Sequence, residues 1–160
     1  MKSICTQLID IINKNLINIK KLKDTFYKKN DGSHVSEGDL LIQKLLQDEI
    51  STNYNKYFLI SEENDHIERW KNYNNFIVLD PIDGTENFIS GMLEWGVGIS
   101  VFENKKHKES VILIPEMNLQ IMSGDKIIKN KSRLSFFIES KIGIALSCLR
   151  HEPKPILICL

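Results

Sequence analysis

Two aspartates, a glycine and a threonine follow directly after a short apolar run, and together they could bind a divalent cation. The run covers residues 76–79, and Asp80-Pro81-Ile82-Asp83-Gly84-Thr85 follows it. Asp80 precedes a proline, which disfavours helical dihedrals, so we expect it to end a buried strand. Carboxylate oxygens are the ligands that hard divalent cations prefer. Gly84 permits a tight turn or a close backbone approach to a ligand, and Thr85 could open a short helix whose free N–H groups face the same place.

These six residues also fit a plain surface turn, because Asp, Pro and Gly are common turn formers. An EF-hand loop fits less well, since Pro81 and Ile82 interrupt the alternating acidic positions that such a loop needs. A second acidic pair, Glu62-Glu63, also stands at the end of an apolar run, over residues 57–61. Two strands that carry acids at their ends can form an active site on a sheet, whereas two surface turns would not need acids at both positions. The paired acids therefore favour the functional interpretation.

The elements that must position these acids can be predicted from periodicity. Apolar residues recur every three or four positions over residues 3–27, which predicts a first helix there. The same spacing predicts a second helix from Ser36 or Glu37 to about residue 50, with Ser36 as a suitable N-cap. Short strands are expected at 57–61, 76–80, 95–102, 109–114 and 119–122, separated by turns. The pattern predicts an α+β fold in which two N-terminal helices pack on an antiparallel sheet. Residues 1–125 form this predicted domain, and 126–160 form a tail with weaker signals.

Composition limits the partners and the compartment. The chain has 160 residues, 42% of them hydrophobic, with 21 basic and 21 acidic residues, which predicts one domain with a sizeable core. A net charge of zero gives no case for a nucleic-acid partner. Cys5, Cys148 and Cys159 are widely spaced and lack a zinc-binding pattern, which favours a reducing compartment. No signal peptide and no membrane-length apolar run is evident, so the sequence predicts a soluble, cytoplasmic protein.

Three stretches together resemble the inositol monophosphatase family of Mg²⁺-dependent, lithium-sensitive sugar-phosphate phosphatases. They are Ser61-Glu62-Glu63, then Asp80-Pro81-Ile82-Asp83-Gly84-Thr85 with Asn87-Phe88, and the segment from Gly32 to Asp39, which is similar to the motif before the family's second helix. The resemblance runs in the right order from residue 1 to about residue 124 and fades after that. It implies the first half of the family's layered α-β-α-β-α fold.

The resemblance also implies a site for two Mg²⁺ ions. Glu62, Asp80 and the backbone carbonyl of Ile82 would be ligands of the first ion. Asp80 and Asp83 would be ligands of the second. Two metal ions of this kind can stabilise both the attacking and the leaving oxygen of a phosphoryl transfer, so no covalent nucleophile is needed.

The same resemblance assigns roles to the residues around the metals. Thr85 together with Glu62 would orient a water molecule for in-line attack on phosphorus. Asp83 and the N–H groups of Gly84 and Thr85 would hold the substrate phosphate. Asp39 would help to hold the water or an outer metal, although its place in the first turn of a helix is also explained by the helix dipole.

Members of the family are longer, and their second half supplies a Trp-Asp-x-Ala-type motif whose aspartate completes the second metal site. Here no aspartate follows Asp125, and the later carboxylates are Glu139 and Glu152. The hypothesis is a truncated family member, which corresponds to the N-terminal half and could be inactive alone. The resemblance would allow a homodimer, or a separate chain that supplies the missing half.

Three functions follow from this interpretation and remain open at this point. The first is an Mg²⁺-dependent phosphatase acting on a small phosphorylated sugar or inositol. The second is a 3′(2′),5′-bisphosphate nucleotidase, to which the segment from Ile60 to Glu63 also bears some likeness. The third is a non-catalytic remnant or an interaction protein.

Overall fold

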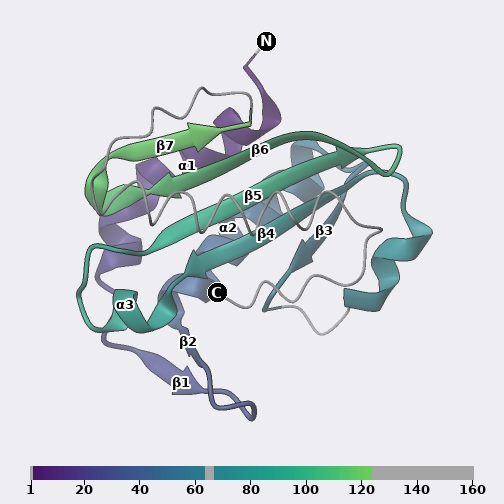
Figure 1. Cartoon of the computed structure of the whole chain (residues 1–160). Helices are drawn as coiled ribbons and strands as arrows, with labels where there is room; N and C mark the ends of the chain where they lie inside the picture. The colour runs from purple at the N-terminus through teal and green to yellow at the C-terminus, as the bar shows by residue number, and fades with distance from the viewer. Residues whose placement is uncertain (1, 64–66, 124–160) are drawn as a thin grey trace, which may run out of the picture. The chain divides into compact units, whose positions relative to one another are not determined.

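The computed structural model describes residues 2–63 and 67–123 of the chain. The chain divides into two units, Met1–Ser123 and Gly124–Leu160. The described residues all lie in the first unit, and the predicted tail over residues 126–160 lies outside them. Figure 1 shows the two long helices of this unit, its five-stranded sheet and a separate two-stranded hairpin.

The two long helices, α1 (Ile4–Lys20) and α2 (Glu37–Asn53), begin at serines that cap them. The Ser3 hydroxyl accepts a hydrogen bond from the N–H of Thr6, at 3.1 Å, and Ser36 forms a capping box with Asp39. Such caps satisfy N–H groups that have no partner inside the helix. The predicted N-cap at Ser36 is therefore confirmed. No helix in the described part has the length and apolar character needed to cross a membrane.

The first helix is shorter than its apolar spacing predicts. The prediction carried it to residue 27, but it ends at Lys20, and the chain turns into strand β1 (Phe26–Lys28). This strand pairs antiparallel with β2 (His34–Ser36), so the hairpin's hydrogen bonds replace those of further helical turns. The polar residues between the two helices therefore belong mostly to this hairpin.

The main sheet has the strand order β3-β4-β5-β6-β7. In that order its strands are Phe58–Ser61, Phe76–Asp83, Gly96–Glu103, Lys106–Ile114 and Leu119–Met122. The pairs from β4 to β7 are antiparallel, as predicted, but β3 and β4 are parallel. The predicted antiparallel sheet is therefore corrected to a mixed sheet, within an α+β fold that is confirmed. Residues 62–75, which include the 3-10 helix η1 (Ile67–Asn72), are long enough to form the crossover that parallel strands need.

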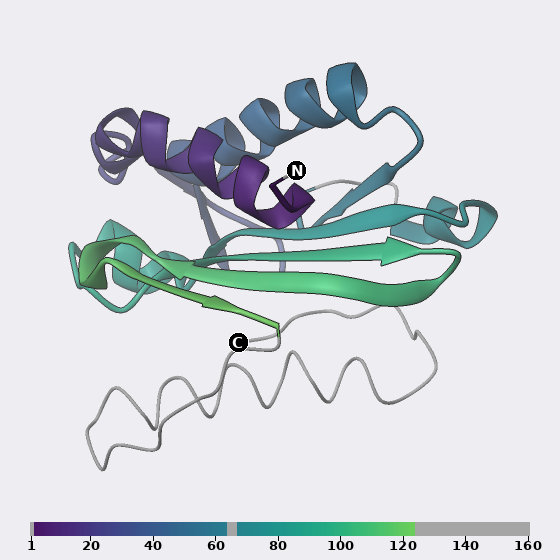
Figure 2. The same ribbon diagram turned by 90° about the horizontal axis from the view of Figure 1, so that it is seen from above.

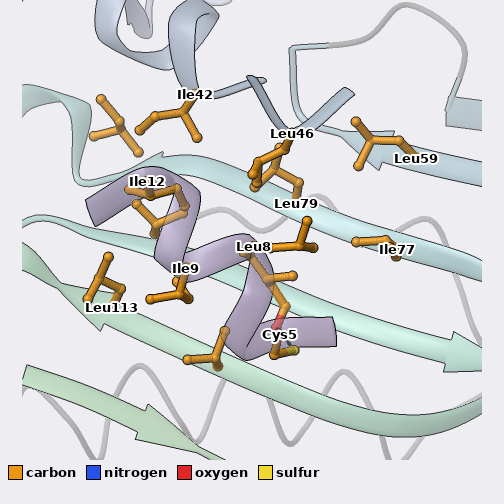
Figure 3. Close-up of a cluster of buried hydrophobic side chains, with 14 of the residues drawn as sticks. Cys5, Leu8, Ile9, Ile12, Ile42, Leu46, Leu59, Ile77, Leu79 and Leu113 are labelled. Carbon is orange, nitrogen blue, oxygen red and sulfur yellow. Dashed lines mark hydrogen bonds between the residues drawn. The ribbon is translucent and has the colours of Figure 1, made fainter. Parts of the chain in front are cut away.

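The two helices cover one face of the sheet, as Figure 2 shows from above. Their apolar stripes meet the inward side chains of the strands in a core closed to solvent (Figure 3). Members that are at most 1% exposed include Leu8, Ile12, Ile42, Leu46, Ile77 and Leu79. Burying one such side chain stabilises the fold by about 1.5–3 kcal/mol. This packing holds α2 against β4, and so places Asp39 beside the turn that follows β4.

Gly38, in the first turn of α2, lets this helix approach the chain that follows β4. A Cβ atom on Gly38 would lie 2.9 Å from two carbons of the Phe88 ring and 3.1 Å from Cδ1 of Ile82. Phe88 belongs to the short helix α3 (Thr85–Ile89) and is buried. A ring inside a filled core has little room to move. The lack of a side chain at Gly38 therefore sets how closely α2 packs on α3.

We expect Gly38→Ala to lower the free energy of unfolding by about 1–3 kcal/mol, the usual cost of extra atoms in a filled core. Helix propensity alone predicts the opposite, a gain of up to about 1 kcal/mol. Urea unfolding measures the difference, with Gln47→Ala at an exposed position of the same helix as the control. A Gly38→Ala protein as stable as the wild type would contradict the close packing of α2 on Phe88.

Candidate functional site

The parallel pairing of β3 and β4 brings the two acidic segments to the same edge of the sheet. Ser61, the last residue of β3, lies opposite Leu79 in β4, so Glu62 and Asp80 are the next residues of two adjacent strands. Asp80 pairs with Gly98 on the other side and is only 4% exposed. Glu62 and Asp80 therefore follow paired residues of adjacent strands, but the prediction that Asp80 ends its strand is wrong, because β4 runs to Asp83. Strand β4 continues past Asp80, through an irregularity in its pairing, to Asp83.

A tight turn follows β4 and aims a hydroxyl back at the strand. Gly84 has φ 80° and ψ 48°, a left-handed conformation that glycine adopts at little cost, and it caps α3. The Thr85 hydroxyl donates to the carbonyl of Ile82 at 3.0 Å and lies 3.5 Å from Oδ1 of Asp39. A hydroxyl has one proton and two acceptor lone pairs, so the shorter contact is the principal hydrogen bond. The turn thus gathers Asp39, Ile82 and Thr85, three of the predicted site residues.

Asp39 serves both the start of α2 and this turn. It is 1% exposed, and its Oδ2 accepts hydrogen bonds from the N–H of Ser36 at 2.8 Å and from the Ser36 hydroxyl at 2.6 Å. Its other oxygen faces Thr85. Burial raises the pKa of Asp39 to about 6, although the hydrogen bonds from Ser36 oppose the rise. A carboxyl with this pKa changes its charge near neutral pH.

Lys29, which the sequence analysis did not single out, contacts both acids at the end of β3. Its Nζ lies 2.7 Å from Oε1 of Glu63 and 3.3 Å from Oε1 of Glu62. Burial alone would lower the pKa of Lys29, but the hydrogen bonds and charges of Glu63 and Glu62 raise it overall. Burial also raises the pKa of Glu63, against the effect of Lys29. Nothing in the sequence distinguishes Lys29 from the adjacent Lys28, so only the fold identifies it.

Two further contacts attach the β1–β2 hairpin to the helices beside the site. His34 Nδ1 of β2 pairs with Oε1 of Glu86 in α3. The Tyr27 hydroxyl of β1 donates to Oε1 of Glu37 in α2, at 3.0 Å. With Lys29, the hairpin therefore contacts the end of β3 and the first turns of two helices.

The predicted site residues lie in one region, but they form two contact groups. One group joins Asp39, Thr85 and the carbonyl of Ile82, and the other joins Glu62 to Lys29. Over residues 2–63 and 67–123, no three His, Cys, Asp or Glu side chains are grouped so that they could hold a metal ion. The predicted roles of these residues remain predictions.

A sequence model of the inositol monophosphatase family matches residues 2–135. The 3′(2′),5′-bisphosphate nucleotidase CysQ of Haemophilus influenzae is 34% identical over 89 residues, which are 54% of this chain and 33% of the relative. The matched segment thus spans about a third of that relative's length.

Solved structures give the same fold. A dual-specific IMPase/NADP phosphatase bound with D-inositol-1-phosphate matches with a TM-score of 0.61 at 22% identity, over 74% of this chain and 44% of that chain. An IMPase/NADP phosphatase complexed with Mg²⁺ and phosphate matches with a TM-score of 0.62 at 23% identity, over 81% of this chain and 52% of that chain. At these identities, the likeness shows the fold alone.

We expect the buried Asp39 to make stability depend on pH. Because its pKa is about 6 in the folded chain and 3.8 ordinarily, the folded chain binds this proton more tightly. The free energy of unfolding should therefore fall by up to about 3 kcal/mol as pH rises from about 4 to about 6, and then level off. Asp39→Asn should remove this component, while Asp48→Asn, at an exposed position of the same helix, should keep it. Urea unfolding between pH 4 and 7 measures both, and equal pH slopes for wild type and Asp39→Asn would contradict the prediction.

Proposed function

Because the chain belongs to the inositol monophosphatase family, we propose that it hydrolyses a phosphate monoester of inositol or a related sugar in an Mg²⁺-dependent reaction. One observation carries this proposal. The Thr85 hydroxyl is held between Asp39 and the carbonyl of Ile82, directly after the part of β4 that carries Asp80 and Asp83. A hydroxyl fixed between a carboxylate and a carbonyl can orient a water molecule, and orientation is much of what phosphoryl transfer requires.

The atoms proposed as ligands at this edge are all oxygens, the kind of ligand that Mg²⁺ prefers. Glu62, Asp80 and the carbonyl of Ile82 would hold one ion, and Asp80 and Asp83 a second, since hard cations take oxygen ligands. The Ile82 carbonyl has a second lone pair beyond the one that accepts from Thr85. Glu62 already holds a positive charge, the ammonium of Lys29, so this edge is suited to a cation. When bound, the ions would neutralise charge on the phosphoryl oxygens and lower the pKa of a nearby water.

The residues of the turn have separate tasks in this reaction. Thr85 donates its proton toward Ile82 or Asp39, so its oxygen keeps a lone pair free to accept from a water molecule. Glu62 would be the second acceptor that orients this water for in-line attack. The N–H groups of Gly84 and Thr85 would hold the phosphate, together with Asp83. The left-handed conformation of Gly84 directs the backbone into this turn.

Asp39 gives this arrangement a dependence on pH. Its Oδ1 is the second acceptor near the Thr85 hydroxyl, at 3.5 Å, beside the closer carbonyl of Ile82. Ionised Asp39 would help to keep the hydroxyl proton directed inward, and protonation would weaken this effect. Burial raises the pKa of Asp39, so activity should rise with pH as this carboxyl ionises.

A second substrate class is favoured by one comparison. The CysQ relative, which is 34% identical over the matched segment, is a 3′(2′),5′-bisphosphate nucleotidase. The same catalytic turn would serve both reactions, because each cleaves a phosphate monoester. The two substrates differ in the group that carries the phosphate, so a direct comparison of rates separates them.

We expect the purified 160-residue chain to release phosphate from inositol 1-phosphate only when millimolar Mg²⁺ is present. Asp83→Asn should abolish the release, because it removes a carboxylate proposed both as a ligand and as a substrate contact. Asp48→Asn, an exposed aspartate of α2, is the matched control and should keep the wild-type rate.

The same assay decides between the alternatives. Faster release from 3′-phosphoadenosine 5′-phosphate would make the nucleotidase the better assignment. No release from either substrate, by a chain shown to be folded, would overturn the catalytic proposal and leave a non-catalytic role.

A further inference from the structure

We propose that Lys29 is an internal cation that competes with a divalent metal ion for Glu62, and that metal binding at this edge is therefore an exchange of one cation for another. The proposal rests on the proposed function, since it takes Glu62 to be a metal ligand. It assigns Lys29 as a positioning residue that sets the metal affinity without touching the substrate.

The two contacts of Lys29 are unequal. The contact with Glu63 is 2.7 Å long, and the Glu63 side chain is only 9% exposed. The contact with Glu62 is 3.3 Å long, and the Glu62 side chain is 44% exposed. A short contact to a buried carboxylate is harder to break than a long one to an exposed carboxylate, because water can replace only the second partner. Lys29 is thus anchored on Glu63 and reaches to Glu62.

The hairpin holds Lys29 in this place. Its backbone N–H donates to the carbonyl of Ser33 at 2.7 Å, and its carbonyl accepts from the N–H of Gly32 at 3.1 Å. The side chain of Asp31 in turn accepts from the N–H and the hydroxyl of Ser33, at 3.0 and 2.7 Å. The base of the side chain is therefore fixed by the hairpin loop rather than free to follow the ammonium group.

A divalent ion on Glu62 would face this ammonium directly. A ligand oxygen lies about 2 Å from Mg²⁺, and Oε1 of Glu62 is 3.3 Å from Nζ, so the two positive charges would be only a few ångströms apart. Like charges at that separation repel strongly even when partly screened. A metal ion that binds Glu62 must therefore displace Lys29 from it, while Lys29 can remain paired with Glu63. Glu63 thus gives Lys29 a second carboxylate to hold while Glu62 is released.

We expect Lys29→Met to bind Mn²⁺ about tenfold more tightly than the wild type, since it removes the repelling charge. The dissociation constant can be measured from the free-Mn²⁺ electron paramagnetic resonance signal during titration of the full chain. Lys28→Met is the matched control, because it removes the same charge from the adjacent, exposed position at the end of β1 and should bind Mn²⁺ like the wild type. Lys29→Arg keeps the charge and should not tighten binding.

A second measurement does not depend on Lys29 being dispensable for folding. In the wild type, the Lys29 side-chain NMR resonance, assigned by its loss in Lys29→Met, should shift on addition of Mg²⁺, while the Lys28 resonance should not. Glu63→Gln should weaken Mn²⁺ binding, because Lys29 then has Glu62 as its remaining charged partner.

The outcomes separate this inference from the proposed function. Equal Mn²⁺ affinity of Lys29→Met and Lys28→Met, in chains that bind Mn²⁺, would overturn the exchange and leave the metal site standing. A Lys29 resonance that does not respond to saturating Mg²⁺ would also overturn it. The lack of Mn²⁺ binding by the wild type and every variant would instead overturn the metal site on which both proposals rest.

Discussion

The parallel pairing of β3 with β4 is the constraint on which the candidate site depends. In a parallel pair both strands end at the same edge, so the residues that follow Ser61 and Leu79 are neighbours. An antiparallel pair would have placed Glu62 at the opposite edge from Asp80. The crossover through residues 62–75 is therefore what allows two acidic segments, far apart in the sequence, to contribute to one site.

The start of α2 links this edge to the stability of the fold. Asp39 completes the capping box with Ser36, and Gly38 beside it permits contact with Phe88. The same Asp39 faces the Thr85 hydroxyl, and burial raises its pKa to about 6. Keeping it ionised near neutral pH costs stability that a neutral cap would not cost. A buried, ionisable cap is therefore poorly explained by helix formation alone, which supports a role for Asp39 in the turn.

Local chemistry predicted the parts of the structure that depend on local sequence. The cap at Ser36, the strand after Phe76 and the turn at Gly84 each follow from side-chain types within a few residues. The predicted length of α1 was wrong. Leu22 and Phe26 continue the helical spacing, although the helix ends at Lys20 and the chain pairs as a hairpin from Phe26. The direction of β3 relative to β4 was missed, because alternation describes a strand's faces and not its partner. The role of Lys29 was also missed, because its contacts with Glu62 and Glu63 join residues more than thirty positions apart, which local sequence patterns do not show.

Charge balance at the acidic edge shows why such long-range contacts matter for function. The net charge of the chain is zero, yet Glu62 and Glu63 follow β3 directly beside the part of β4 that carries Asp80. Carboxylates taken partly out of water need a positive partner, and the hairpin supplies one in Lys29. The charge of Lys29 balances these acids in the chain without metal, and under the proposed exchange it would weaken their affinity for a metal ion. Metal affinity at the proposed site would then be set jointly by the ligands on the sheet and by a lysine on a separate hairpin.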